Sequence, residues 1–237
     1  MTSDVSPERT PRQQTAARAI ANILLETKAV NFRPEEHYTL TAGWASPVYI
    51  DCRWLISFPA ARRTITLLAR EEIEQTMGLE NLDTVAGGET AGIPYAAWIS
   101  DTLSVPMQYV RKKPKGFGRM AQIEGQLEEG SKVLLVEDLA TDDGSKLAFV
   151  KAIRDAGAVC NHTFVVFFYG AFPGALDSLA KEDVSLLYLC TWADVLVAAE
   201  AGDYFDADKI AGVRDFLKDP IGWSTAHGGR GDGHGAD

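Results

Sequence analysis

The stretch VLLVEDLATDDGS, Val133–Ser145, is the most informative part of this sequence about its fold. Its first four residues, Val133–Val136, are all apolar, which is typical of a strand buried on both faces of a parallel sheet. Two acids follow, Glu137 and Asp138, and then a short turn that contains threonine and glycine. A helical pattern begins near Ser145. The stretch therefore predicts a strand, a turn and a helix in immediate succession.

The turn of this stretch has the chemistry of a phosphate site. Ligands of parallel α/β sheets bind at the carboxyl ends of the strands. A turn that enters a helix presents free backbone N–H groups and the positive end of the helix dipole, and Thr141 and Ser145 add hydroxyl donors. Glu137 and Asp138 suit such a place if they bind sugar hydroxyls or a magnesium complex. We therefore predict a site for a phosphorylated sugar; the alternative is a plain loop with solvated acids.

Strands and helices alternate on both sides of this stretch. The predicted strands lie at 83–86, 105–110, 133–136, 164–168 and 184–189, and the predicted helices at 12–30, 59–77, 93–103 and 145–156. A strand–turn–strand unit is predicted over 38–51, with its break at Gly43. Continuous apolar strands that alternate with helices indicate an α/β fold with a parallel sheet covered on both faces.

Composition excludes several classes of protein. The 237 residues carry 23 basic and 33 acidic side chains, a net charge of −10, so we expect no nucleic-acid partner and no anionic membrane partner. Three widely spaced cysteines and four scattered histidines predict no structural zinc and a reducing, cytoplasmic location. No apolar run approaches the roughly 20 residues that span a bilayer, and no signal-peptide pattern is present.

A cationic cluster stands out in this acidic chain. Five cations lie within nine residues without an acid among them: Arg111, Lys112, Lys113, Lys115 and Arg119. Gly116 and Gly118 add backbone freedom. A mobile cationic flap suits a diphosphate leaving group, because it places positive charge where negative charge develops and excludes water on closure. The alternative is a solvated basic loop.

A glycine-rich turn is predicted at Ala86–Ile93, AGGETAGI. Its glycines allow backbone to approach a ligand closely and to cradle an anion through N–H groups. The alternative is an ordinary turn into a helix.

These motifs together resemble those of a known family. VLLVEDLATDDGS resembles the phosphoribosyl-diphosphate (PRPP) motif of type I phosphoribosyltransferases. Three further segments, LTAGWASPVYIDCR at 40–53, GGETAGIPYAAWISD at 87–101 and YVRKKPKGFGRMAQIEG at 109–125, are similar to the orotate phosphoribosyltransferase family. The similarity covers residues from about 15 to 200. It implies a parallel sheet flanked by helices with a small hood.

The resemblance also implies an activity. The phosphoribosyl group of PRPP is transferred to orotate, which gives orotidine 5′-monophosphate and diphosphate in pyrimidine synthesis. Mg²⁺ is the implied cofactor, held mainly by PRPP with no direct protein ligand. The implied assembly is a homodimer whose cationic loop reaches the partner's site, with Lys115 at the position of the loop's catalytic lysine.

Site residues follow from the resemblance. The implied catalytic residues are Lys115, Glu137 and Asp138. PRPP binding is implied for Arg111, Lys112, Lys115, Glu137, Asp138, Leu139, Ala140, Thr141, Asp142, Asp143, Gly144 and Ser145. Orotate binding is implied for Tyr49, Ile50 and Thr141, with a core-strand role as the equal alternative for Ile50. The implied diphosphate loop is Glu89, Thr90 and Ala91.

The chain departs from the family pattern at several positions. Phe117 stands where the family loop commonly has histidine, and Asp143 replaces a glycine of the phosphate turn, with its side chain expected to face solvent rather than the phosphate. Tyr169 stands where some members carry an orotate-binding arginine, and Ala91 where some carry lysine. The alternatives are therefore a PRPP-sensing regulator on the same fold, or a phosphoribosyltransferase for another base.

One domain is predicted, over residues 12–223. The implied hood comes largely from about 12–55 and the core from about 56–200. Residues 1–11 are predicted to be a disordered tail, and the glycine-rich residues 224–237 another, with the Arg-Gly-Asp triplet at 230–232 taken as accidental.

Overall fold

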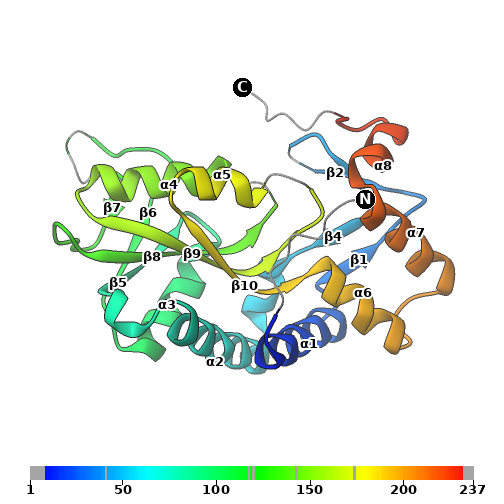
Figure 1. The fold of residues 1–237 in the computed structure, drawn as a ribbon, viewed down its shortest axis with the longest axis horizontal. Coiled ribbons are helices and arrows are strands. Elements are labelled where there is room, and N and C mark those ends of the chain that lie inside the picture. The colour runs from blue at the N-terminus through cyan, green and yellow to red at the C-terminus, as the bar shows by residue number, and fades with distance from the viewer. Residues whose placement is uncertain are drawn as a thin grey trace.

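A six-stranded sheet forms the centre of the computed structural model, which describes residues 9–40, 42–116, 118, 121–141, 144–172 and 175–231 (Figure 1). The strands are β5 Thr84–Gly88, β6 Met107–Val110, β7 Ile123–Glu124, β8 Lys132–Ala140, β9 Val159–Phe168 and β10 Ser185–Thr191. Their order is β10-β9-β8-β5-β6-β7. Neighbours pair in parallel except β7, which is antiparallel to β6. The predicted parallel α/β sheet is confirmed.

Helices cover both faces of this sheet. The helices are α1 Pro11–Glu26, α2 Pro59–Thr76, α3 Gly92–Leu103, α4 Gly144–Asp155, α5 Ala175–Lys181 and α6 Trp192–Ala201, with 3-10 turns at Cys52–Ser57 and Leu79–Asn81. Figure 1 shows α4 and α5 on one face and α1, α2 and α3 on the other. None of the helices in the described ranges is long and apolar enough to cross a membrane.

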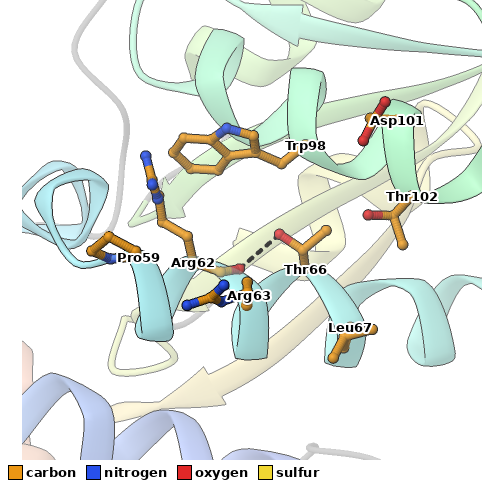
Figure 2. A pocket seen from close by; sticks show the side chains of 8 residues that line it. All are labelled: Pro59, Arg62, Arg63, Thr66, Leu67, Trp98, Asp101 and Thr102. Carbon is orange, nitrogen blue, oxygen red and sulfur yellow. Dashed lines mark hydrogen bonds between the residues drawn. The ribbon is translucent and has the colours of Figure 1, made fainter.

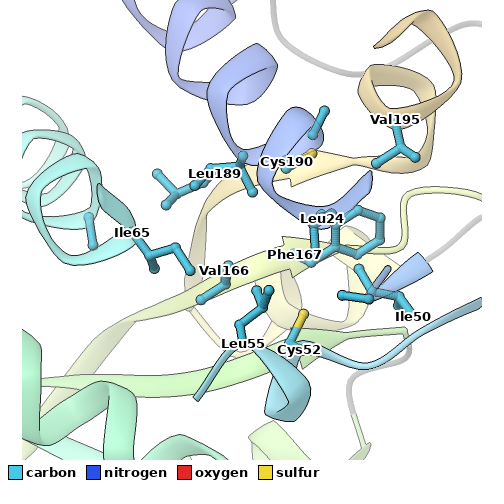
Figure 3. Packing of buried hydrophobic residues seen from close by; sticks show 14 of the residues in the cluster. Leu24, Ile50, Cys52, Leu55, Ile65, Val166, Phe167, Leu189, Cys190 and Val195 are labelled. Carbon is cyan, nitrogen blue, oxygen red and sulfur yellow. The ribbon is translucent and has the colours of Figure 1, made fainter. Parts of the chain in front are cut away.

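The side chains of β8 alternate between the two faces of the sheet, which explains why helices cover both faces. Leu134 and Val136 belong to the buried cluster formed with α1, α2 and α3, whereas Val133 and Leu135 belong to the cluster formed with α4. Each fully buried aliphatic side chain of this kind contributes roughly 1.5–3 kcal/mol. Figure 3 shows the first cluster, where Leu24, Ile65 and Phe167 from three elements converge. The four-residue apolar run Val133–Val136 thus contributes side chains to two separate hydrophobic cores.

A small subdomain lies beside the sheet. It consists of β1 Val30–Phe32, β2 Tyr38–Thr39, β3 Ala45–Ser46, β4 Val48–Ile50, α7 Ala207–Lys218 and α8 Pro220–Ala226. Strand β1 pairs with β4, and β2 pairs with β3, both antiparallel. Gly43 closes the β2–β3 hairpin with a φ of 86°, which agrees with the predicted break.

The hood predicted from about 12–55 differs from this small subdomain. Helix α1 packs against β10 and α6, because its apolar residues Ile20 and Leu24 belong to the main core. The C-terminal helices α7 and α8 take its place, packing against β1 and β3. The sequence pattern did not predict α5, α6, α7 or α8.

The N-terminal boundaries differ slightly from the prediction. The helix predicted over 12–30 ends at Glu26, and Val30 already belongs to β1. Arg9, assigned to the tail, forms an ion pair with Asp194 at 2.7 Å. The first eight residues of the chain lie outside the described ranges.

The C-terminal tail was predicted to begin at residue 224, but regular structure continues beyond this residue. Helix α8 continues to Ala226, and the Arg230 N–H donates to the Gly43 carbonyl at 2.8 Å. Residues 232–237 lie outside the part of the chain that the structure describes. The glycine content of this stretch signals disorder locally, but hydrogen bonds to a distant hairpin fix its first residues.

Candidate functional site

Two acids mark the carboxyl end of the central strand β8. The strand continues four residues beyond the predicted 133–136, so Glu137 and Asp138 lie within it, and Glu137 stands opposite Val165 of β9. Pairing with β9 on one side explains the extension. Glu137 is only 8% exposed, and its Oε1 is buried without a hydrogen-bond partner among the described residues. A buried acceptor without a donor is rare in folded proteins and marks this atom for a ligand.

Burial controls the protonation of this pair. It raises the pKa of Glu137 to about 7; the charge of Asp138 raises that pKa further, while Lys146 and Lys112 lower it. Burial also raises the pKa of Asp138, against the opposing charges of Arg53 and Lys146. An acid that titrates near neutrality at the end of a central strand is typical of a functional site.

Two of these cations, Lys146 and Arg53, were not predicted from the sequence as site residues. Lys146 lies in the first turn of α4 and is 3% exposed. In the sequence it looks like an ordinary surface lysine of a helix; its position just after the phosphate turn is the only signal. Arg53 follows β4, and its Nε donates to Asp51 at 3.1 Å. Its closeness to Asp138 arises from the fold and has no local signature.

The raised pKa predicts a pH-dependent stability. Between pH 4.5 and about 7, folded Glu137 keeps a proton that the unfolded chain has released, so stability falls as pH rises through this window. Glu137→Gln should therefore stabilise the ligand-free protein at pH 8, by up to about 3 kcal/mol, and much less at pH 5. Denaturation by urea at the two pH values measures the difference. An exposed control, Asp155→Asn, should show none; equal effects of Glu137→Gln at both pH values would contradict the assignment.

The glycine-rich turn between β5 and α3 lies directly against this pair. A Cβ placed on Gly88 would overlap the Glu137 carboxylate, and one on Gly92 would overlap the Val136 carbonyl. These glycines thus allow the turn to approach β8. The Glu89–Thr90 peptide bond is cis, and Ala91 is the N-cap residue of α3. The three residues of the implied diphosphate loop therefore lie at the carboxyl end of β5, between two glycines that contact β8.

The cationic loop starts at the same edge of the sheet. The Lys112 N–H donates to the Glu89 carboxylate at 2.7 Å, which joins the loop to the glycine-rich turn. Arg111 forms an ion pair with Glu124 at 3.4 Å. Lys113 and Lys115 are exposed, and the Lys115 N–H donates to the Ala121 carbonyl at 2.7 Å. Phe117 and Arg119 lie outside the described residues. The structure thus brings Lys112 close enough to Glu137 to lower its pKa, pairs Arg111 with Glu124, and leaves Lys115 on an outer loop.

The predicted phosphate turn follows β8. Leu139 and Ala140 complete the strand, and the Ala140 carbonyl accepts the Tyr169 N–H at 2.7 Å. Thr141 forms a bend, and Gly144 and Ser145 open α4. The two acids Asp142 and Asp143 lie outside the described residues.

Strand β4 brings the two residues of the implied base site to the small subdomain. The Tyr49 ring lies 5.1 Å from the Tyr38 ring, whereas Ile50 is 4% exposed and packs in the main core. The Tyr169 hydroxyl is 2.6 Å from Ser46 Oγ and joins β9 to the hairpin. Tyr169 therefore serves as a structural bridge between the end of β9 and the hairpin.

A separate groove of about 400 Å³ lies between α2 and α3 (Figure 2). Its lining is Pro59, Arg62, Arg63, Thr66, Leu67, Trp98, Asp101 and Thr102. The Arg62 guanidinium lies 5.1 Å from the centre of the Trp98 ring. The groove is on the outer surface of two helices and contains none of the predicted site residues.

Curated proteins similar to this chain are named orotate phosphoribosyltransferase. An orotate phosphoribosyltransferase of Cereibacter sphaeroides is 53% identical over 220 residues, which cover 93% of this chain and 95% of that protein. The solved orotate phosphoribosyltransferase of Aeropyrum pernix is 29% identical with a TM-score of 0.65, over 76% of this chain and 99% of that one. The UMP synthase of Leishmania donovani is 26% identical with a TM-score of 0.73, over 86% of this chain and 43% of that one. No protein-family model matches the chain.

Proposed function

Because the chain belongs to the orotate phosphoribosyltransferase family, we propose roles in that reaction for the residues around the acidic pair. The enzyme transfers the phosphoribosyl group of PRPP to orotate and forms orotidine 5′-monophosphate and diphosphate, a step in pyrimidine biosynthesis. The alternatives of a PRPP-sensing regulator and of an enzyme for another base have no support from the relatives, which are named for orotate.

The single observation that supports our site assignment is the buried Oε1 of Glu137 without a partner. A carboxylate there needs donors, and the two hydroxyls of a ribose supply them. Asp138, next in the strand and less buried, accepts from the same sugar. The turn from Thr141 to Ser145, with the start of α4, holds the 5′-phosphate through N–H groups and the helix dipole.

The reaction needs no nucleophile from the protein. Orotate N1 forms a bond to ribose C1 as the bond from C1 to the diphosphate oxygen breaks, and the ribose becomes cation-like in between. The proton of orotate N1 leaves with the diphosphate. Asp138 stabilises this positive charge by its own negative charge in a poorly hydrated place. Arg111 and Lys112 neutralise the departing diphosphate from the edge of the sheet where Glu89 anchors their loop.

The acidic pair is compatible with a Mg²⁺ ion that is held mainly by PRPP, with no direct protein ligand. Within the described ranges no three carboxylate, histidine or cysteine side chains gather into a metal site. The donor set around Glu137 and Asp138 is two oxygen-bearing side chains, which suits an ion that takes most of its ligands from substrate oxygens. When bound, Mg²⁺ neutralises charge on the diphosphate. The role of Glu137 is to hold the ribose hydroxyls in place beside it.

We propose that the base binds between the small subdomain and the end of β8. Tyr49 and the Thr141 hydroxyl contact orotate, and Ile50, whose side chain belongs to the core, contributes through its backbone.

We also propose that the protein resides in the cytoplasm. The three cysteines are buried free thiols, which supports residence in this reducing compartment.

A direct assay tests the function. Purified protein with PRPP, Mg²⁺ and orotate should consume orotate, seen as a loss of its absorbance, and release diphosphate in equal amount. Omission of PRPP is the control. Conversion of a different base with no conversion of orotate would overturn the proposal.

We propose further that the enzyme is a homodimer in which Lys115 serves the partner's site. The exposure of Lys115 on an outer loop supports this arrangement. Mixing inactive Lys115→Ala with inactive Asp138→Ala should restore part of the activity, because some mixed dimers hold one site with both residues intact. Native mass spectrometry verifies subunit exchange. Activity that stays at zero after verified exchange would show that the site is not shared.

A further inference from the structure

The segment Ser224–Arg230, here called the C-terminal clasp, is built into the small subdomain. Ser224 is fully buried; its hydroxyl accepts the Ala45 N–H at 3.0 Å and donates to the Arg230 carbonyl at 2.7 Å. The Arg230 N–H in turn donates to the Gly43 carbonyl at 2.8 Å. One hydroxyl thus joins the clasp to a hairpin 179 residues away in sequence. Figure 1 shows α8 beside β2.

Close packing accompanies these hydrogen bonds. A Cβ on Gly229 would overlap the backbone nitrogen of Ala45, so glycine is required at this contact. The Arg230 guanidinium lies 5.0 Å from the centre of the Trp44 ring, at cation–π distance. Trp44 also stacks on Phe172, with ring centres 4.5 Å apart. The tip of the hairpin is therefore held by the clasp and by the segment after β9.

The β2–β3 hairpin needs such support. Its ladder has two residue pairs, Tyr38 with Ser46 and Thr39 with Ala45. Isolated two-stranded hairpins are marginal in water, so tertiary contacts decide where this one sits. The hairpin leads directly into β4, and Tyr38 packs against Tyr49 at 5.1 Å. A shift of the hairpin therefore moves the proposed base-binding tyrosine.

We propose that the C-terminal clasp is a positioning element of the base site, with Arg230 as its main side chain. The inference rests on the proposed function, in which Tyr49 contacts orotate. The contacts by which Ser224 and Arg230 hold the hairpin involve neither the acidic pair nor Thr141. The clasp thus sets the affinity for the base and leaves the affinity for PRPP unchanged.

Steady-state kinetics of three changes test the proposal. Arg230→Ala should raise KM for orotate about fivefold, and truncation after Ala226 about tenfold or more, since small displacements of a contact residue are costly. KM for PRPP and kcat should stay within about twofold in both. Arg230→Lys, which keeps the charge, should recover part of the affinity. Truncation after Gly231, which keeps the whole clasp, is the matched control and should behave as the full chain.

Hydrogen exchange provides a readout that needs no substrate. Amides of residues 38–46 should exchange faster in Arg230→Ala and in the chain truncated after Ala226 than in the control. Unchanged exchange there, or a KM for PRPP that rises together with KM for orotate, would overturn the proposal. Failure of the full chain to convert orotate would instead count against the proposed function, and exchange alone would then decide whether the clasp holds the hairpin.

Discussion

The substitution Lys115→Ala is expected to lower kcat by about 10²–10³-fold. This is the usual cost of losing one charge-assisted contact to a leaving group in the transition state. Folding should be unaffected, because Lys115 is exposed on the loop between β6 and β7. Initial rates of orotate consumption at saturating substrates give kcat, and calorimetry gives the melting temperature.

Lys113 provides a matched control for this change. It is an exposed cation of the same loop, two residues away, and it has no proposed role. Lys113→Ala should leave kcat within about threefold, because exposed charges act weakly through water. Similar losses in both variants would mean that the loop acts by its total charge, and a kcat within twofold for Lys115→Ala would remove its catalytic assignment.

The second large effect is expected for Asp138→Asn. The change keeps the shape of the side chain and removes the negative charge that faces the cation-like ribose, so kcat should fall by about 10²-fold or more. It should also lower the pKa of Glu137, because the charge of Asp138 helps to raise that pKa. The rise of kcat/KM for PRPP, which we expect near pH 7 in the unmodified enzyme, should therefore move to lower pH.

This shift separates a catalytic role from a structural one. A variant that is merely less well folded loses activity at every pH without moving the profile. Asp155→Asn, on the exposed end of α4, serves as the control and should change neither kcat nor the profile. A profile that stays in place together with an unchanged kcat would contradict both the electrostatic coupling and the role of Asp138.

Much of the fold was predictable because its decisive residues are neighbours in sequence. The run Val133–Val136 is buried on both faces, and this property alone distinguishes a parallel strand from an exposed one. Gly43 lies at the predicted break, and Gly78 directly follows the helix predicted over 59–77; each has a positive φ. The position of Glu137 at the carboxyl end of a central strand follows from the same local pattern.

The remaining features depend on contacts between distant segments. Acids after an apolar run normally signal the end of a strand, yet β8 continues because Leu139 and Ala140 pair with β9. The burial of Lys146 depends on how α4 packs over the sheet. The order of the clasp comes from Ser224 and its partners near Gly43, which no composition rule connects.

The close packing around Gly88 ties three positions into one unit of variation. A Cβ at position 88 would overlap the Glu137 carboxylate and would lie 2.7 Å from the Phe149 ring. A shorter acid at 137 removes only one of these two collisions, so alanine at 88 also requires a shift or a smaller side chain at 149. Mutant libraries aimed at this pocket should therefore randomise positions 88, 137 and 149 together.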